Sequence, residues 1–353
     1  MMEKRLLART SILLGFIVVW VFSASSTVFG KDDVERFYRG KNVEFVIGNK
    51  PGGGYNAYAR LVAKHMADHI PGGPNLIPKN MTGAGGAAAL FYLANVAPKD
   101  GSAIGNAQPG TIMEPLLRLK NKNLGFDPLK FNYLGNANTE TSLCILRREA
   151  SVKTFQDALK KEAALGGSGS STIQFTLVHN GILGTKFKLV RGYGGTGEIS
   201  LAVQRGEVDG LCGQFWSSLQ LQHPEWVTSG AFNIIVQEAT TGHPILNRMG
   251  VPLVYDFAKT KQEKQALDLF FLPLRFGRPF VAPPGVPAER LAALRKAFSE
   301  AVADPKLLAE AKKMRLPIDD PISGEEVQKL VSRLYETPPS IVERVRKAVM
   351  RDQ

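Results

Sequence analysis

Glycine-rich turns are the feature of this sequence that is best suited to chemistry. The first turn, Pro51-Gly52-Gly53-Gly54, separates a strand-like apolar run at 43–47 from a helical pattern of apolar residues at 58–66. Glycine lets a ligand approach the backbone closely, and the first turn of a helix presents unpaired N–H groups. A strand, a glycine turn and a helix in this order therefore predict a site that binds an anionic group.

The same strand, turn and helix unit recurs along the chain, with further glycine turns at 80–86, 166–171, 192–198 and 208–213. The carboxyl ends of parallel strands meet at one edge of a sheet, so we expect these turns to line a common cleft. The residues predicted to bind the ligand are Gly52, Gly53, Gly54, Tyr55, Asn56, Thr82, Gly83, Ala84, Gly85, Ser168, Ser170, Ser171, Thr172, Tyr193, Gly194, Gly195, Thr196 and Asp209.

Motifs for catalysis or metal binding are incomplete in this sequence. Residues 83–88 fit the loose dinucleotide fingerprint, but glycine-rich turns match that pattern by chance. Ser168 lacks the second glycine of a nucleophile elbow, because Ser170 occupies its place. His65 and His69 have the spacing of a zinc protease, but the glutamate of that motif is missing between them. We therefore expect binding without catalysis, cofactor or metal.

The first 30 residues have the pattern of a signal peptide. Three basic residues precede an apolar run of about 11 residues, which is short of the roughly 20 that a membrane-spanning helix needs. Small residues follow the run, and no cysteine stands there to carry a lipid. The sequence thus predicts a periplasmic protein, exported by a signal peptide that is removed and without a lipid anchor.

The chain of 353 residues is basic, with a formal net charge of +12. Its lysines and arginines are scattered, with no basic stripe interleaved with aromatic residues, so nucleic acid is not an expected partner. Two interpretations of the charge stay open. It attracts an acidic ligand to the protein, or it only keeps the surface solvated.

Length and pattern together predict an α/β protein of two lobes. The chain beyond residue 30 exceeds the roughly 250 to 300 residues at which single cores stop growing. Alternating strands and helices indicate a mainly parallel sheet in each lobe. We expect residues 31–132 and 248–353 to form one lobe and 133–247 the other. In the helical C-terminal section, Ser323 and Glu326 have the spacing of a capping box.

The two cysteines, Cys144 and Cys212, leave two interpretations open. In an oxidising compartment they can form a disulfide. The other interpretation, which the sequence favours slightly, is two separate buried thiols on apolar strands.

Several ordered blocks make the chain resemble the extracytoplasmic solute receptors of tripartite tricarboxylate transporters, the citrate-receptor type that includes the Bordetella uptake receptors. The blocks span the chain beyond the signal sequence and are 37–41, 51–55, 58–60, 69–72, 80–85, 97–101, 206–210 and 279–287. The resemblance implies a two-lobed periplasmic-binding-protein fold of the Venus flytrap, type II, class. It also implies that Gly52 to Tyr55 and Thr82 to Gly85 hold one carboxylate of the ligand.

In such a receptor the second lobe would add the turns Ser168 to Thr172 and Tyr193 to Thr196. The ligand implied is a small organic acid, either a di- or tricarboxylate or an aromatic carboxylate. The partner implied is a membrane permease with a large and a small subunit, served by a monomeric receptor. Many relatives have aspartate where this chain has Asn56. Two alternatives are a ligand sensor of the same fold that acts on a signalling partner and, less favoured, an exported hydrolase.

Overall fold

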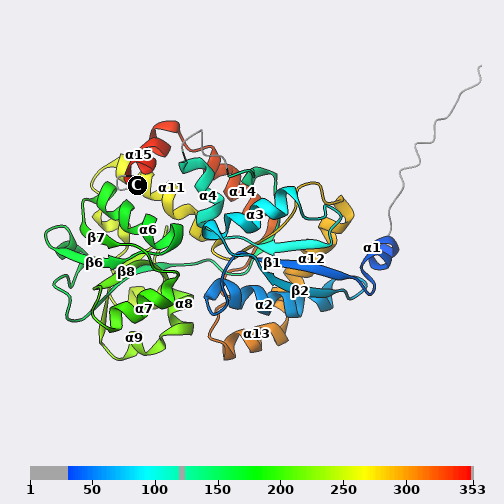
Figure 1. Ribbon diagram of the computed structural model, residues 1–353, viewed down its shortest axis with the longest axis horizontal. Coiled ribbons are helices and arrows are strands. Elements are labelled where there is room, and N and C mark those ends of the chain that lie inside the picture. Colours follow the sequence, from blue (N-terminus) through cyan, green and yellow to red (C-terminus); the bar gives the residue numbers. More distant parts are fainter. Residues whose placement is uncertain (1–30, 119–123, 351–353) are drawn as a thin grey trace, which may run out of the picture.

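The computed structural model describes residues 31–118 and 124–350, and within this part the side chains of residues 31 and 169–171 are outside the description. The predicted signal peptide, 1–30, also lies outside the described residues. The chain forms two lobes side by side, each with one β-sheet between layers of helices (Figure 1). None of the helices in the described ranges is long and apolar enough to cross a membrane.

The sheet of the first lobe has six strands. β1 pairs in parallel with β2 and β3, whereas β10 runs antiparallel to β3 and β4. Their order across the sheet is β11 (Ile322–Ser323), β4 (Asn132–Asn136), β10 (Pro279–Ala282), β3 (Ala103–Asn106), β1 (Asn42–Ile47) and β2 (Asn75–Asn80).

The sheet of the second lobe has five strands. β6 is parallel to β7 and β8, and β5 is antiparallel to both β8 and β9. Their order is β7 (Lys186–Val190), β6 (Glu162–Gly166), β8 (Gly210–Phe215), β5 (Ser142–Arg147) and β9 (Phe232–Glu238). Both sheets are thus mixed. β5 and β10 each begin at the junction between the lobes, whereas their neighbouring strands end at that junction, so β5 and β10 run in the opposite direction.

Helices cover both faces of each sheet (Figure 1). Those of the first lobe are α1 (Lys31–Tyr38), α2 (Gly54–Met66), α3 (Ala87–Asn95), α4 (Pro109–Leu117), α12 (Ala288–Ala303), α13 (Pro305–Lys313) and α14 (Gly324–Tyr335). Those of the second are α5 (Phe155–Ala158), α6 (Gly169–Val178), α7 (Thr196–Gln204), α8 (Trp216–Gln222), α9 (Pro224–Thr228) and α10 (Pro244–Arg248). Short 3₁₀ turns are η1 (Ala67–His69), η2 (Ala84–Gly86), η3 (Pro128–Lys130), η5 (Val254–Phe257) and η6 (Leu272–Phe276), and η4 (His179–Leu183) is a π-helical turn.

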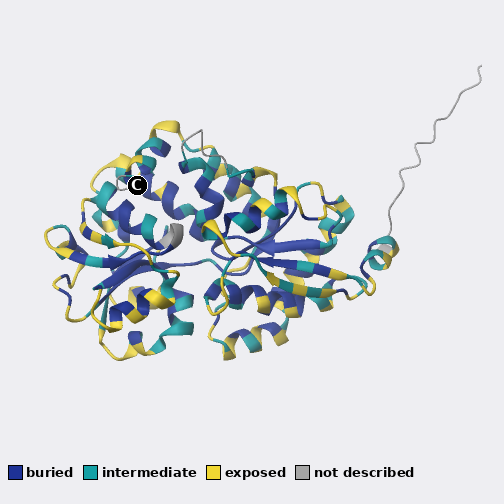
Figure 2. Ribbon diagram, viewed as in Figure 1, coloured by how far each residue is buried: buried dark blue, intermediate teal, exposed yellow. Residues whose placement is uncertain are grey.

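Burial follows the sequence pattern that predicted these elements. The apolar end of β1, Phe45 to Ile47, is fully buried, and the central strands of both sheets form the dark centre of each lobe in Figure 2. The predicted capping box of α14 is present, because the Ser323 hydroxyl accepts from the Glu326 backbone N–H and the Glu326 carboxylate accepts from the Ser323 N–H. Local rules therefore account for where these elements start.

Cys144 on β5 and Cys212 on β8 form a disulfide. The two strands are antiparallel neighbours, and their register shifts between Leu143 and Ile145, so that the two cysteines face each other across a bulge. Both side chains are fully buried. Of the two interpretations that the sequence left open, the structure thus has the disulfide, which ties two strands of the second lobe together.

The last helices depart from the expected division of the chain. α11 (Lys261–Phe271) and α15 (Pro339–Val349) pack against each other, and α15 also packs on α6 and η4 of the second lobe and on α4 of the first. Figure 1 shows α15 above α6, far along the sequence from it. Residues 339–349 therefore bridge the lobes, whereas the sequence pattern assigned all of 248–353 to the first.

Candidate ligand-binding site between the lobes

The first glycine turn joins the carboxyl end of β1 to the start of α2. Gly52 has a positive φ of 92°, which favours glycine, and Gly53 precedes the helix without any side-chain cap. The amides of Gly54 and the two residues after it therefore form an uncapped helix start. Gln222 of α8 donates to the Gly52 carbonyl at 3.3 Å, so this turn already touches the second lobe.

The second turn follows β2 and has four successive residues, Gly83 to Gly86, with positive φ. Ala84 is one of them, with φ 43°, a conformation that is costly for a residue with a Cβ. α3 starts after Gly86 without a side-chain cap. Thr111 donates to the Gly85 carbonyl at 2.6 Å and fixes the turn. Successive backbone amides in such a conformation make an anion-binding concavity.

The third turn is arranged differently from the prediction for Thr172. Its hydroxyl accepts from the Ser168 N–H at 2.7 Å and donates to the Ser168 carbonyl at 2.8 Å, and the residue is buried. Thr172 thus closes the turn and is engaged there. Ser168 is the residue before α6, and Ser170 and Ser171 are in the first turn of this helix, where their side chains lie outside the description.

The fourth turn, Tyr193 to Thr196, carries its own acid. Glu198 in the first turn of α7 accepts from the Gly194 N–H at 2.7 Å. A carboxylate at this helix start takes the place that an anionic ligand would take, and it repels a second anion. This turn is therefore the least suited of the four to an acidic ligand.

Asp209, one of the residues predicted for the site, makes contacts inside the second lobe. Its carboxylate accepts from the Ala164 N–H at 2.9 Å and from the Arg147 guanidinium at 3.2 Å. These contacts tie the start of β8 to β6 and to the end of β5. Because both carboxylate oxygens are engaged, Asp209 is occupied within the second lobe.

A buried charged group that sequence reasoning missed lies where the lobes meet. Arg278, just before β10, is 2% exposed, and its Nε donates to Glu140 Oε1 at 2.8 Å. Its Nη2 donates to the hydroxyls of Ser217 at 2.8 Å and Ser218 at 3.0 Å, both on α8. The guanidinium also lies 4.3 Å from the centre of the Tyr55 ring. Arg278 therefore joins the first glycine turn to the second lobe.

The surroundings of Arg278 keep it charged. Burial is the largest single influence on the pKa of Arg278 and lowers it, but the Glu140 carboxylate, Tyr55 and Tyr58 together outweigh burial and raise that pKa above its usual value. Burial also raises the pKa of Tyr55 and of Tyr58, whose ring centre lies 4.7 Å from the guanidinium. Phe215, at the end of β8, completes the aromatic shell at 5.0 Å. The site thus holds a fixed positive charge among neutral rings.

Three buried polar atoms around Tyr55 have no hydrogen-bond partner in the described part of the protein. They are Nδ2 of Asn56, Oδ1 of Asn106 and Nη1 of Arg278. Asn56 follows Tyr55, the Asn106 amide donates to the Tyr55 carbonyl at 3.3 Å, and Arg278 stacks on its ring. Buried polar groups are nearly always paired, so this set calls for a polar partner. The donors Asn56 and Arg278 suit a carboxylate.

Two atoms of the second lobe extend this set of unpaired polar atoms. Oγ of Ser142 and Oε1 of Gln214 are also buried without a partner in the described ranges. They lie on the paired strands β5 and β8, next to Phe215, whose ring centre is 5.9 Å from that of Tyr55. No sequence pattern singles out these two side chains, because each lies at the end of a mainly apolar strand.

The histidines considered for zinc bind separate carboxylates. His65 lies 2.9 Å from Glu310, and His69 lies 3.1 Å from Asp304. These pairs fasten α2 and η1 to α13 and the residue before it. Both histidines are thus engaged in packing the first lobe.

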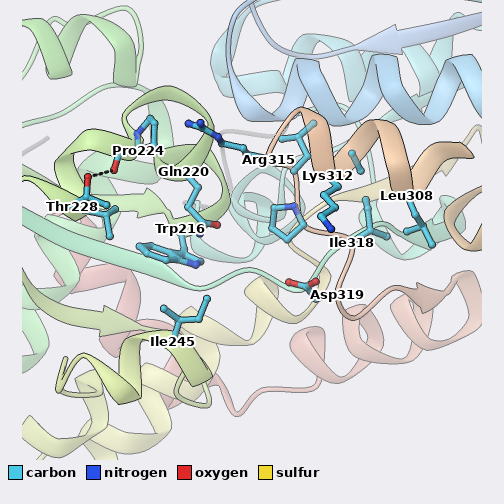
Figure 3. Close-up of a pocket in the computed structure, with 14 residues that line it drawn as sticks. Trp216, Gln220, Pro224, Thr228, Ile245, Leu308, Lys312, Arg315, Ile318 and Asp319 are labelled. Atoms are coloured by element: carbon cyan, nitrogen blue, oxygen red, sulfur yellow. Dashed lines mark hydrogen bonds between the residues drawn. The ribbon is translucent and has the colours of Figure 1, made fainter. Parts of the chain in front are cut away.

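A cavity of about 600 Å³ lies apart from the glycine turns, between α8, α9 and α10 of the second lobe and α13 of the first (Figure 3). None of the residues predicted for the ligand lines it. The predicted site and this cavity are therefore two separate places at the lobe junction.

No family model matches the chain, and no curated protein sequence matches it. Solved structures are similar over most of their length. Periplasmic binding protein BugD has 20% identity and a TM-score of 0.67 over 88% of this chain and 98% of its own. MatC from Rhodopseudomonas palustris with bound malate has 22% identity and a TM-score of 0.64 over 88% and 99%. A further R. palustris protein, with adipate, has 18% identity and a TM-score of 0.66 over 88% and 97%. The chain therefore has the two-lobed α/β fold of these periplasmic binding proteins.

Proposed function

We propose that the protein is a periplasmic solute receptor of the tripartite tricarboxylate transporter type, which captures a small organic carboxylate between its lobes without chemistry. The observation that carries this proposal is the set of unpaired buried donors, Asn56 and Arg278, beside the uncapped start of α2. Backbone amides of the first two turns would hold a carboxylate, and Arg278 would supply the positive charge behind them.

The two solved neighbours with malate and adipate support a carboxylate as the ligand class. Both names denote small acids with two carboxyl groups. In this chain the first two glycine turns suit one carboxyl group, and the lobe-two atoms of Ser142 and Gln214 suit the polar far end of the ligand. Glu198 argues against a carboxyl group at the fourth turn.

Delivery to a membrane permease is the second part of the proposal. The first turn contacts α8 through Gln222, and Arg278 contacts it through Ser217 and Ser218. A ligand bound here would touch both lobes and favour the closed arrangement that a permease recognises.

The ligand class can be tested by thermal unfolding in the presence of acids. We expect the melting temperature to rise with the concentration of at least one di- or tricarboxylate, aromatic carboxylate or acidic amino acid. No response to any of these acids would contradict the proposal.

The variant Gly53→Val tests whether the first glycine turn binds the acid. A Cβ at Gly53 would meet no protein atom within 4 Å, and its φ of −97° is open to any residue. The variant should therefore unfold at the temperature of the unaltered protein and lose the response to the acid. An unchanged response would show that the first turn is not the site.

Uptake measurements test the permease role. Cells that lack the receptor should lose uptake of the identified acid, and normal uptake would indicate a sensor of the same fold instead.

A further inference from the structure

We propose that the cavity between α8, α9, α10 and α13 is a second binding site, which takes an amphipathic monoanion such as a medium-chain alkyl carboxylate. Its volume of about 600 Å³ is within the range of small-molecule sites. The inference is independent of the carboxylate site at the glycine turns, since none of their residues lines this cavity.

The lining is mainly apolar and comes from both lobes. Trp216 and Val227 contribute from the second lobe, and Leu316 and Ile318 contribute from the segment after α13. Ile245 and Leu308 also line the cavity, and these large apolar residues are 38% and 39% exposed to solvent. Figure 3 shows these two on opposite sides of the cavity. An alkyl chain between them would remove apolar surface of both lobes from water.

Charge at the cavity favours a single negative group. Lys312, Arg315 and Asp319 line it, which leaves one positive charge in excess. Among the described residues, none of these three side chains forms an ion pair within 4.0 Å, either with one another or with another residue. Figure 3 shows Lys312 extending toward Asp319 and Arg315 extending toward Gln220 and Pro224. A carboxylate fits these donors, and a planar guanidinium can hold it through two parallel hydrogen bonds.

The backbone at Arg315 provides a second, independent observation. α13 ends in a turn that two backbone hydrogen bonds close. The Leu316 N–H donates to the Ala311 carbonyl at 2.9 Å, and the Arg315 N–H donates to the Lys312 carbonyl at 3.1 Å. Arg315 has a φ of 55° in this turn, at the position where glycine is usual. Arg315 thus has a large side chain in a backbone conformation that favours glycine. Strained residues of this kind are frequent at functional sites.

Calorimetric titration with octanoate tests the site on the purified protein with its disulfide intact. We expect one saturable site with a dissociation constant of about 0.1–1 mM. Propionate, which lacks the chain, and octanamide, which lacks the charge, should each bind at least about tenfold more weakly. Absence of saturable octanoate binding up to about 10 mM would overturn the proposal.

Arg315→Gly is the decisive variant, because it separates binding from folding. Glycine relieves the positive φ, so the melting temperature should stay equal or rise. Octanoate affinity should nevertheless fall about fivefold to tenfold. Lys312→Gln should have a similar effect, while the matched control Lys313→Gln, the next residue of α13 and absent from the lining, should have none.

Unchanged octanoate affinity in Arg315→Gly and Lys312→Gln would overturn the site. Loss of octanoate binding in Gly53→Val, with full binding in Arg315→Gly, would also overturn it and would place octanoate at the glycine turns.

Discussion

Gly54 and Ser218 approach each other so closely that a Cβ on Gly54 would lie 2.3 Å from the Ser218 hydroxyl oxygen. The first belongs to the glycine turn of the first lobe and the second to α8 of the other lobe. This contact shows that the lobes meet at the first turn, and that glycine is required there for close approach and not for an unusual φ.

Gly54→Ala should therefore hold the lobes apart and weaken carboxylate binding about tenfold. Ser218→Ala added to it removes the colliding oxygen, and the nearest remaining atom is then Nη2 of Arg278 at 3.1 Å. We expect calorimetry to show affinity partly restored in the double variant. Equal affinities of Gly54→Ala and the unaltered protein would mean that this contact does not form in the bound state.

Arg278→Met should lower the free energy of unfolding by about 3–5 kcal/mol, because it leaves Glu140 buried without its partner. Adding Glu140→Gln should cost less than the sum of the two changes. Lys188→Met is a matched control, since Lys188 and Glu162 form an ion pair at 2.6 Å with exposures of 67% and 58%. This variant should cost less than about 1 kcal/mol in urea unfolding. Similar losses for both pairs would contradict a special role of burial.

Removal of the disulfide should destabilise the second lobe. The bond closes a sequence separation of 68 residues, for which the chain-entropy estimate is about 4 kcal/mol. Cys144→Ser with Cys212→Ser should lower the urea midpoint by a corresponding amount, and the reduced unaltered protein should behave likewise. If the midpoint is unaffected by either change, the bond does not constrain the unfolded chain as assumed.

Acid should weaken the contact of α2 with α13 through Glu310. Lys64 at 2.7 Å and His65 at 2.9 Å donate to its carboxylate and lower the pKa of Glu310 below its ordinary value of 4.5. A lowered carboxyl pKa gives stability that is present above pH 4.5 and is lost as the pH falls through the folded value. Glu310→Gln should thus differ from the unaltered protein at pH 7 and approach it near pH 3.

Exposed Glu149, which has no ion pair in the described ranges, supplies the control for this acid effect. The difference between Glu149→Gln and the unaltered protein should stay small across the same pH range. A pH-independent difference for Glu310→Gln would rule against the ionised contact.

Asp209→Asn separates structure from ligand binding. Its loss of contacts with Arg147 and the Ala164 N–H should lower the melting temperature. Carboxylate affinity of the folded variant should stay within about twofold of the unaltered protein, because Asp209 is engaged inside the second lobe. A large drop in affinity at unchanged stability would return Asp209 to the ligand site.

The sequence predicted those features that depend on local order. The turn at Gly52 to Gly54 lies between a strand and a helix, as expected, since glycine and the apolar periods on either side act over a few residues. The capping box of Ser323 and Glu326 is local in the same way and is confirmed.

Features that depend on distant pairing were not accessible. Arg278 and Glu140 are 138 positions apart, and a lone charge before an apolar strand does not disclose its partner. The contact of Glu198 could have been predicted from the sequence, because an acid two residues after Thr196 lies in the first turn of a helix, where acids typically accept from backbone amides. Its acceptance of the Gly194 N–H leaves one backbone donor fewer for a ligand at the fourth turn.

The position of α15 has a consequence for the order in which the protein can fold. Residues 339–349 cover α6 and η4 of a lobe whose other elements were completed about 90 residues earlier in synthesis. Until α15 has been synthesised, the face of α6 that it covers stays open, and the second lobe cannot complete its packing. The second lobe therefore completes its packing only after residues 339–349 have been synthesised, so the two lobes reach the native state as one unit.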